Sequence, residues 1–347
     1  MSGTQARTAD AAAAAEVVCL GESMVTFLPS QPGRLADVPS FGRGIGGAES
    51  NVACALAAAG HRAAWVSRVG ADGFGDHLVE AIAGYGVDTS GVRRDPSRPT
   101  GIYFRTATDR ATDVHEVAYY RAGSAASAMS PRNTPYETLP VARVLHLSGI
   151  TAALSADCLA LLHDLTAPRP GRPLVSFDVN HRPGLWRDAD ASPEVLLELA
   201  RRSDLVFVGE DEAAEAWGVT GAAAIRRALP EPSVLVVKRG AEGATVFSGA
   251  DGVTTVPALR VDVVAPVGAG DAFAAGFLSA TLRDLPVRDR VRHGHLMAAA
   301  VLTVPGDLTG PPARAHADAL AALDDEAWGR LRLGPGWTGD DQEVRTT

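Results

Sequence analysis

The chain has 347 residues, of which 46% are hydrophobic and 21% are charged, and its formal net charge at pH 7 is -9. This length suits one large α/β domain or two smaller ones, and the composition is typical of a globular protein. The acidic balance argues against nucleic-acid binding, and no window approaches the ~18–20 apolar residues of a membrane span.

The two ends of the chain differ in composition from the middle. Residues 1–15 are rich in alanine with polar residues interspersed, and they lack the leucine-rich core of a signal peptide. Residues 335–347 are mostly polar. We therefore expect a disordered tail over residues 1–15, a single domain over residues 16–330 and a flexible tail over residues 335–347.

Short apolar runs alternate with helical patterns through most of the chain. The runs predict strands over residues 17–20, 64–69, 144–147, 174–177, 205–208 and 234–237. Helices are predicted over residues 52–59, 74–85, 156–165, 194–202 and 210–217, from residue 268 onward, and over residues 288–304. Wholly apolar strands are typical of a sheet buried on both faces. The sequence therefore predicts an α/β fold with a mainly parallel central sheet flanked by helices on both faces.

Two segments interrupt this alternation. Residues 28–45 contain several prolines and glycines and are expected to form a loop or irregular edge structure, while residues 23–27 could continue the first strand. Residues 100–107 and 116–121 are β-rich with polar residues interleaved, and residues 108–113 are typical of a turn. These features predict a small β lid formed by about residues 28–45 and 97–125, although a plain edge hairpin would have the same pattern.

Polar or glycine-rich segments stand where five of the extended stretches end. They are Gly21-Glu22, Gly70–Asp72, Asp178–Arg182, Lys238–Gly240 and Gly268–Asp271. Ligands of open α/β sheets bind at the carboxyl ends of the strands. The sequence therefore predicts one active-site cleft at this edge of the sheet.

The stretch from Val263 to Phe273 joins an extended apolar segment to a helix through a glycine turn. Gly268, Ala269 and Gly270 let the backbone approach a ligand closely, and the free N–H groups of a helix start suit a phosphate. Asp271 could be a simple helix cap. Alternatively, its carboxylate takes a proton from a hydroxyl while the amides hold phosphate oxygens, which is most of what phosphoryl transfer requires.

Two other nucleotide-binding patterns fit poorly. The G-x-x-x-x-G-K-[ST] spacing is absent, which excludes a P-loop enzyme. Residues 42–47 read G-x-G-x-G-G and have no clean preceding strand, so they give only weak support to a dinucleotide-dependent oxidoreductase.

The cysteines and lysines are few. Cys19, Cys54 and Cys158 are odd in number and widely separated, and they form neither a metal-binding spacing nor a disulfide framework. We therefore expect a reducing compartment, the cytoplasm. Lys238 is the only lysine among 32 lysines and arginines, so the arginine count carries little functional information.

Two motifs resemble those of the ribokinase-like (PfkB) carbohydrate kinases, and the resemblance extends from about residue 16 to about residue 325. Gly46–Ala53 (GGAESNVA) is similar to the N-terminal signature of that family, and Gly268–Phe273 (GAGDAF) is similar to the C-terminal one. Two motifs in the right order are more specific than either alone. The resemblance implies a small β lid and transfer of a phosphoryl group from ATP, with Mg²⁺, to a sugar hydroxyl.

The same resemblance implies roles for the motif residues. Asp271 is the implied general base, and the amides of the turn Gly268–Gly270 form the implied anion hole. Gly46, Gly47 and Asn51 are implied on the substrate side.

Finer detail suggests a subfamily. Residues 21–26, 119–127 and 178–186 resemble segments of 2-keto-3-deoxygluconate kinases. That substrate carries a carboxylate, which arginine binds bidentately, so Arg121 and Arg182 are candidate ligands. Tyr103 and Tyr119 offer hydroxyl groups and ring faces for the sugar chain. The tyrosines could instead pack within a hairpin, and Arg182 could instead pair with Asp178 or Glu212.

The nucleotide side follows from the resemblance as well. Asn180 and the turn Lys238–Gly243 are implied near ATP, with Lys238, Gly240 and Gly243 as the candidate residues. Glu212 matches the acidic end of an N-x-x-E motif and is a candidate Mg²⁺ ligand through water, although Gly209 replaces the asparagine. Ala265 stands where many relatives have an aspartate that helps to hold a monovalent cation. We therefore expect weak or absent K⁺ activation.

The sequence thus predicts an ATP-dependent sugar-acid kinase that phosphorylates the terminal hydroxyl of 2-keto-3-deoxygluconate. The alternatives are a fructokinase-like or ribokinase-like kinase of a neutral sugar, a dinucleotide-dependent oxidoreductase and a catalytically idle sugar-binding regulator. The pattern predicts no nucleic-acid or membrane partner and does not separate the gluconate from the galactonate epimer. An exposed β lid favours pairing into a homodimer or a larger homo-oligomer.

Overall fold

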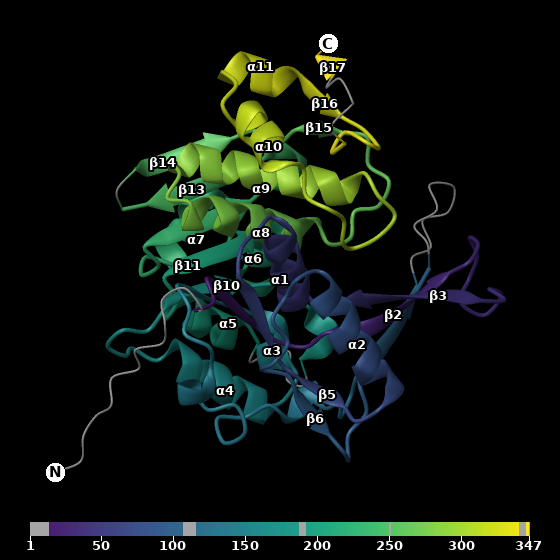
Figure 1. Cartoon of the computed structure of the whole chain (residues 1–347). Helices are drawn as coiled ribbons and strands as arrows, with labels where there is room; N and C mark the ends of the chain where they lie inside the picture. The colour runs from purple at the N-terminus through teal and green to yellow at the C-terminus, as the bar shows by residue number, and fades with distance from the viewer. Residues whose placement is uncertain (1–13, 107–115, 187–191, 250, 340–344, 347) are drawn as a thin grey trace.

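The computed structural model describes residues 14–106, 116–186, 192–249, 251–339 and 345–346 (Figure 1). The predicted tail over residues 1–15 lies almost wholly outside these ranges, and the turn predicted at residues 108–113 lies outside them entirely. In the described part of the chain, every helix is too short or too polar to cross a lipid bilayer.

The centre of the molecule is an eight-stranded sheet with the order β14-β13-β12-β11-β10-β9-β1-β4. Its parallel strands are β1 (Val17–Leu20), β4 (Ala63–Val66), β9 (Val144–Ser148), β10 (Leu174–Asp178), β11 (Leu205–Gly209) and β12 (Val234–Lys238). Each of the six predicted strands has a counterpart in this sheet, but the stretch predicted over residues 64–69 divides, because Arg68–Gly70 forms a strand of a separate sheet. An antiparallel hairpin, β13 (Ala244–Ser248) and β14 (Gly252–Val256), extends one edge and was not predicted.

Helices cover both faces of this sheet, as predicted. One face carries α1 (Ala48–Ala58), α2 (Gly73–Gly84), α8 (Ala269–Leu282) and α9 (Val287–Leu302). The other carries α3 (Gly149–Ala153), α4 (Ala156–Thr166), α5 (Ser192–Arg201), α6 (Glu210–Trp217) and α7 (Ala222–Ala228). Successive residues of β1 enter opposite cores, because Cys19 packs in the first and Leu20 in the second. This two-sided burial explains why the strands are apolar throughout.

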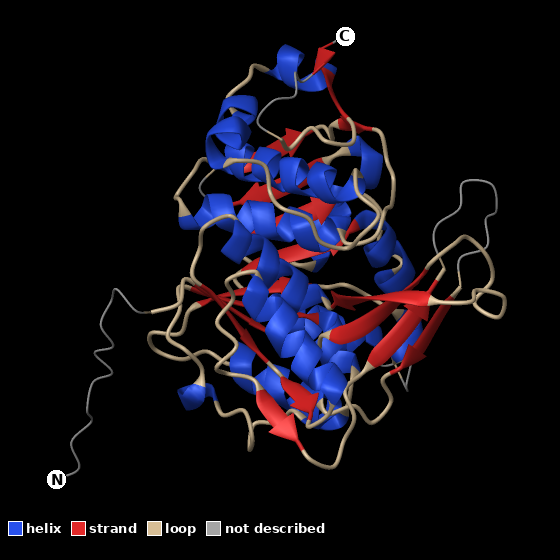
Figure 2. Ribbon diagram, turned by 45° about the vertical axis from the view of Figure 1, so that its right-hand side comes forward, coloured by secondary structure: helices blue, strands red, loops and turns tan. Residues whose placement is uncertain are grey.

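A smaller sheet with the order β3-β2-β7-β8 projects from the main body and forms the lid (Figure 2). Its strands are β2 (Met24–Pro29), β3 (Phe41–Gly46), β7 (Ile102–Arg105) and β8 (Val117–Tyr120). Residues 24–29 therefore begin the lid and do not continue β1. The glycine-rich residues 42–46 lie in an antiparallel strand of the lid, outside the central sheet, so they are not part of the parallel βαβ unit that dinucleotide binding requires.

The C-terminal part packs beyond α9. It contains α10 (Arg314–Ala321), α11 (Asp325–Arg330) and a three-stranded sheet of β15 (Arg260–Val261), β16 (Leu331–Leu333) and β17 (Arg345–Thr346). The buried Arg292 of α9 donates to the carbonyl oxygen of Ala321 at 3.0 Å and holds α10 in place. Within the segment expected as a flexible tail, Trp337 is buried and β17 pairs with β16.

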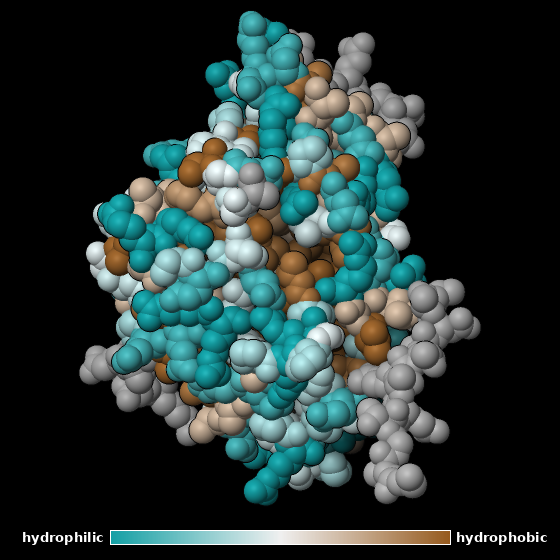
Figure 3. All heavy atoms as spheres, turned by 90° about the vertical axis from the view of Figure 1, so that its left-hand side faces the viewer, coloured by the Kyte–Doolittle hydropathy of each residue, from teal (hydrophilic) through white to brown (hydrophobic). Residues whose placement is uncertain are grey.

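A two-stranded sheet of β5 (Arg68–Gly70) and β6 (Arg93–Asp95) completes the pairing pattern. The face of the molecule in Figure 3 is mostly hydrophilic, and apolar residues gather in a hollow near its middle. Strand β1 lies between β4 and β9, so the order of the central sheet reverses at β1. Ligands of such sheets bind outside the carboxyl ends of the strands at this reversal.

Candidate active site

A pocket of about 590 Å³ opens between the carboxyl ends of the central strands, the start of α8 and the lid. Fourteen of the predicted site residues line it: Gly46, Gly47, Asn51, Tyr103, Tyr119, Arg121, Asn180, Arg182, Glu212, Lys238, Gly268, Ala269, Gly270 and Asp271. The structure therefore brings together residues that are up to 225 positions apart, as from Gly46 to Asp271.

Two predicted nucleotide residues, Gly240 and Gly243, are not brought to this pocket. They shape the tight connection between β12 and β13, where both have a positive φ. A Cβ on Gly243 would lie 2.2 Å from the carbonyl oxygen of Val256 in β14. The demand for glycine at position 243 therefore arises from the hairpin packing.

The glycine turn places Asp271 in the first turn of α8. Gly268 is the residue before the helix, with φ 81°, and a Cβ there would lie 2.5 Å from the carbonyl oxygen of Asp307. The left-handed backbone and the close contact both require glycine. The turn thus brings backbone N–H groups and a carboxylate to one point of the pocket.

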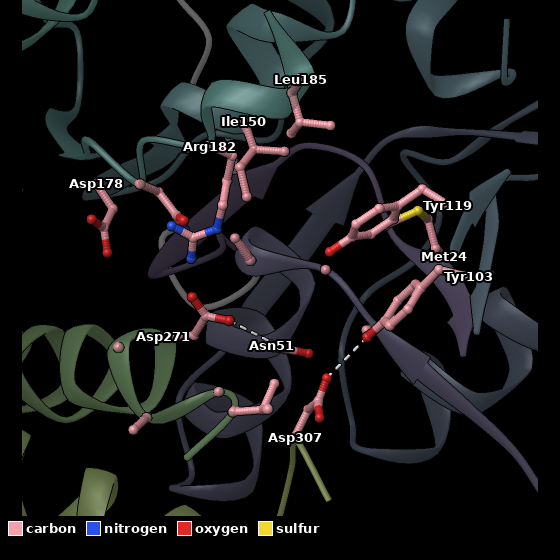
Figure 4. Close-up of a pocket in the computed structure, with 18 of the residues that line it drawn as sticks. Met24, Asn51, Tyr103, Tyr119, Ile150, Asp178, Arg182, Leu185, Asp271 and Asp307 are labelled. Atoms are coloured by element: carbon pink, nitrogen blue, oxygen red, sulfur yellow. Dashed lines mark hydrogen bonds between the residues drawn. The ribbon is translucent and has the colours of Figure 1, made fainter. Parts of the chain in front are cut away.

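Asn51 holds the carboxylate of Asp271. Its side-chain amide donates to the Oδ2 of Asp271 at 2.9 Å, a bond drawn in Figure 4. Burial raises the pKa of Asp271 to about 7, and the charge of Asp178 also raises it, whereas the bond from Asn51 lowers it. Asn51 was predicted on the substrate side, and its observed partner is the predicted base.

A second carboxyl group, that of Glu49, lies buried in the first turn of α1, the helix that also carries Asn51. The Oε1 of Glu49 accepts hydrogen bonds from the hydroxyls of Ser148 at 2.8 Å and Thr151 at 2.7 Å. A Cβ on Gly21 would lie 2.1 Å from the Cδ of Glu49, so the glycine after β1 makes room for this side chain. Burial raises the pKa of Glu49. Its charge in turn contributes to the raised pKa of Asp271.

The lid contributes one wall of the pocket, formed by Tyr103, Tyr119 and Arg121. We call these residues, together with the carboxylates of Glu22 and Asp307 that bind them, the lid wall. Arg121 donates through Nε to the Oε2 of Glu22 at 2.8 Å, and the hydroxyl of Ser124 donates to the other oxygen of Glu22. The side chain of Glu22 is fully buried. Ser124 thus holds the carboxylate of Glu22, and that carboxylate in turn holds the guanidinium group of Arg121.

Asp307 closes the lid wall from the core side. The hydroxyl of Tyr103 donates to its Oδ2 at 3.1 Å, and Arg105 donates to its Oδ1 at 2.5 Å. The rings of Tyr103 and Tyr119 lie 5.4 Å apart. Figure 4 shows the Tyr119 hydroxyl pointing into the same space that Asp271 faces. The tyrosines are therefore both packing residues and pocket residues.

The ends of the central strands form the opposite side, the strand-end wall: Asp178, Asn180, Arg182, Glu212 and Lys238. The Nζ of Lys238 lies 3.0 Å from both carboxylate oxygens of Asp178. Burial lowers the pKa of Lys238, but the charges of Asp178 and Glu212 outweigh burial, and the pKa is raised overall. Asp178 thus pairs with Lys238 and leaves Arg182 to another partner.

Arg182 is the exposed member of the strand-end wall. Its side chain is 54% exposed, and its Nη1 lies 3.6 Å from the Oε1 of Glu212. The guanidinium group and the carboxylate of Asp271 point toward each other across the pocket (Figure 4). The second oxygen of Glu212 accepts from the backbone N–H of Gly209 at 2.7 Å, which caps α6.

The oxygen atoms of the strand-end wall suit a hard metal ion. Among the described residues, no three His, Cys, Asp or Glu side chains are grouped to hold a metal. Asn180, whose φ is 41°, nevertheless brings a buried and unpartnered Oδ1 to the same pocket as Glu212. Mg²⁺ keeps several waters and binds through one or two carboxylates and substrate phosphates. These residues fit such an ion.

Sequence reasoning did not assign roles to Glu22, Asp178 and Asp307. Glu22 and Asp178 lie in segments that were recognised, directly after strands, and an acidic residue at a strand end was the available signal. Asp307 lies in the loop after α9, and nothing local in the sequence links it to the lid. Its partners Tyr103 and Arg105 lie more than 200 positions away.

Comparisons with known proteins agree with this arrangement. Residues 14–314 match the profile described as pfkB family carbohydrate kinase. The chain is similar to a 2-dehydro-3-deoxygluconokinase of Bacillus subtilis, with 36% identity over 86% of this chain and 93% of that one. It is also similar to a probable chloroplastic fructokinase of Arabidopsis thaliana, with 31% identity over 82% of this chain and 75% of that one.

A solved structure shares the fold. An uncharacterized sugar kinase of Pyrococcus horikoshii, determined in complex with ATP, superposes with a TM-score of 0.74 and 26% identity. The match covers 85% of this chain and 95% of that one. The ribokinase-like architecture predicted from the sequence is therefore confirmed.

Proposed function

Because this chain belongs to the pfkB family of carbohydrate kinases, we propose that it is the ATP-dependent kinase of 2-keto-3-deoxygluconate, which is also named 2-dehydro-3-deoxygluconate. One observation carries the proposal: Arg121 and Arg182 line the same pocket as Asp271. A sugar that has a carboxylate at one end and a hydroxyl at the other matches a pocket with cations and a base. The similarity to the Bacillus subtilis enzyme supports this choice of substrate.

Asp271 accepts the proton in the proposed reaction. The terminal hydroxyl of the sugar acid lies between Asp271 and the glycine turn, and its oxygen attacks the γ-phosphorus of ATP. The bond from that phosphorus to the bridging oxygen breaks, ADP leaves, and the hydroxyl proton goes to the Asp271 carboxylate. Asn51 holds that carboxylate in place, and the amides of the turn stabilise the charge on the transferring group.

The raised pKa of Asp271 is suited to this role. A base works best when its pKa lies near the working pH, and burial raises the pKa of Asp271 to about 7. Mg²⁺ held by Glu212, Asn180, water and phosphates would supply positive charge to the phosphate oxygens. In this proposal ATP binds along the strand-end wall, where Arg182 is 54% exposed.

The carboxylate of the sugar acid would bind Arg121 and Arg182. Glu22 occupies one edge of the Arg121 guanidinium group, and a guanidinium group has five N–H donors, so donors remain for a ligand. The Tyr103 and Tyr119 hydroxyls and the Asp307 carboxylate offer partners for the hydroxyls in the middle of the sugar chain. The lid would close over the bound substrate.

A neutral sugar is the second candidate, and the similarity to a fructokinase favours it. In that case, Arg121 would serve only to pair with Glu22, and Arg182 only to contact Glu212 and the carbonyl oxygen of His181. Thr26 is buried in β2, and its methyl group lies 2.9 Å from a Cβ built on the pocket residue Gly46. A neutral threonine there does not repel an acidic substrate.

A substrate panel tests the proposal. Purified protein is incubated with ATP and Mg²⁺ and with 2-keto-3-deoxygluconate, its galactonate epimer, fructose or ribose, and ADP formation is measured. We expect kcat/KM for a keto acid to exceed that for either neutral sugar by at least tenfold. A preference for fructose or ribose would overturn the sugar-acid proposal, and no ATP turnover with any sugar would favour the idle regulator.

Two further expectations concern the setting of the enzyme. We propose that it works in the cytoplasm, which is supported by three free and buried cysteines in the described part of the chain. We also propose a homodimer or larger homo-oligomer formed through the lid, whose Tyr119 and Tyr120 are exposed. Light scattering of the purified protein measures the assembly.

A further inference from the structure

An ion pair between Asp178 and Lys238 spans the carboxyl edge of the central sheet. Asp178 ends β10 and Lys238 ends β12, and β11 lies between these strands. Both carboxylate oxygens of Asp178 lie 3.0 Å from the Lys238 Nζ, and the two side chains are 4% and 19% exposed. A nearly buried carboxylate bonded through both oxygens fixes the position of the ammonium group.

The ammonium group fixed in this way lies against the glycine turn. A Cβ built on Gly270 would meet a single atom within 4 Å, the Lys238 Nζ, at 3.7 Å. Lys238, Gly270 and Asp271 all line the pocket. A cation and the backbone amides of the turn therefore face the same small volume next to the proposed base.

We propose that Asp178 positions Lys238 so that its ammonium group binds the phosphoryl group during transfer, together with the amides of the glycine turn. The proposal rests on the proposed kinase function. An ammonium group has three N–H donors, and the two bonds to Asp178 use two of them, so one is left for a phosphate oxygen. Lys238 stays an ammonium group throughout and forms no covalent bond.

The pairing also fits the charge change of the reaction. Before ATP binds, Asp178 balances the charge of Lys238, which lowers the cost of burying an ammonium group at the pocket edge. As the phosphoryl group crosses toward the sugar, its oxygens enter the volume that Lys238 faces. A preorganised donor at such a point stabilises the transition state more than the bound substrates. In these terms Lys238 is a catalytic residue and Asp178 is a positioning residue.

The competing explanation is that the ion pair only ties β10 to β12. Kinetics separate the two, with whichever sugar the wild type phosphorylates. We expect Lys238→Met to lower kcat about 10²- to 10³-fold while KM for the sugar changes little, and Lys238→Arg to recover part of the loss. Asp178→Asn should lower kcat less, and adding it to Lys238→Met should cost almost nothing more. Thermal unfolding verifies that each variant folds. A Lys238→Met variant that keeps wild-type kcat but unfolds at lower temperature would overturn the proposal.

A second readout uses the fact that Lys238 is the only lysine. Protein grown with ¹⁵N-lysine and carrying a lysine-free tag has a single labelled ammonium group. We expect its ¹⁵Nζ signal to move when aluminium fluoride, which mimics the transferring phosphoryl group, is added to protein with ADP and Mg²⁺. The shift should be lost in Asp178→Asn. A signal that is the same with and without aluminium fluoride, in wild-type protein that turns over ATP, would contradict the proposal. Absence of turnover in the wild type would instead overturn the proposed function.

Discussion

Arg121 on the lid wall and Arg182 on the strand-end wall are both candidate ligands of a carboxylate, but the structure holds them differently. Arg121 is 10% exposed and donates to a fully buried glutamate, Glu22. Arg182 is 54% exposed and lies 3.6 Å from Glu212, beyond hydrogen-bond distance. A side chain that is already fixed loses little conformational entropy on binding, whereas a mobile one loses more. The comparison teaches that Arg121 is held by a buried carboxylate, whereas Arg182 is held only by the carbonyl oxygen of its neighbour His181, so the proposed ligand would have to order more of the Arg182 side chain.

Asp271 belongs to neither wall and faces both, so its loss should have the largest effect. We expect Asp271→Asn to lower kcat about 10²- to 10⁴-fold, because the proton of the attacking hydroxyl loses its acceptor. ADP formation at saturating sugar acid measures this. Near wild-type turnover in the variant would contradict the assignment of Asp271 as the general base.

Thermal unfolding of the same variant tests the raised pKa of Asp271 and shows that the variant folds. Burial raises the pKa of Asp271 to about 7, so ionising its carboxyl group lowers the free energy of unfolding. The stabilising effect of the protonated carboxyl group is therefore lost as the pH rises through about 7. Asp271→Asn should therefore unfold at a higher temperature than the wild type at pH 8, and the difference should shrink toward pH 4.

Removing each arginine tests the comparison directly. A hydrogen bond to a charged group contributes about 1.5–3 kcal/mol, so we expect Arg121→Ala to raise KM for the keto acid about 10- to 100-fold. Arg182→Ala should raise it less, because binding must also order that exposed side chain. KM for fructose is the reference in both variants. A larger effect at Arg182, or equal effects on acid and neutral sugar, would contradict the assigned difference.

The pH profile is the next smaller effect. Asp271 accepts a proton only when it is ionised, and its pKa is about 7. We expect kcat/KM to fall about tenfold per pH unit below that value. Initial rates between pH 5 and pH 9 measure the profile. A profile that is flat from pH 5 to pH 7 would show that Asp271 is not the general base.

Monovalent cations should have the smallest effect. Ala265 is buried just before the glycine turn and offers no side-chain oxygen to a cation. We expect equal rates when Na⁺ replaces K⁺ at constant ionic strength. A many-fold stimulation by K⁺ would show that other ligands, such as backbone carbonyls, hold the ion.

The central sheet and most of its helices were predictable because their signals are local. Apolar runs such as residues 205–208 can be buried only between two helix layers. The hairpin of β13 and β14 was missed because its residues alternate weakly and lie at the edge. Strand β3 was hidden among glycines and prolines, since its pairing with β2 supplies an order that its composition does not.

The glycine turn and Asp271 were likewise visible as a motif, whereas the partners of the lid wall were not. Glu22 meets Arg121 and Asp307 meets Arg105 only after the lid has packed against the core. Gly240 and Gly243 lie outside the pocket, and their contact with ATP stays a prediction. Glycines in a turn after a strand serve a hairpin as readily as a ligand, and only the packing against Val256 separates the two.

The position of Lys238 has a practical consequence for measuring how the sheet opens. A protease that cuts only after lysine has one peptide bond to attack, at the end of a strand paired on both sides by β11 and β13. Cleavage therefore requires that the end of β12 separate from its two neighbours, and it gives two fragments and no others. The rate of that single cut reports the population of molecules in which this end of β12 has opened.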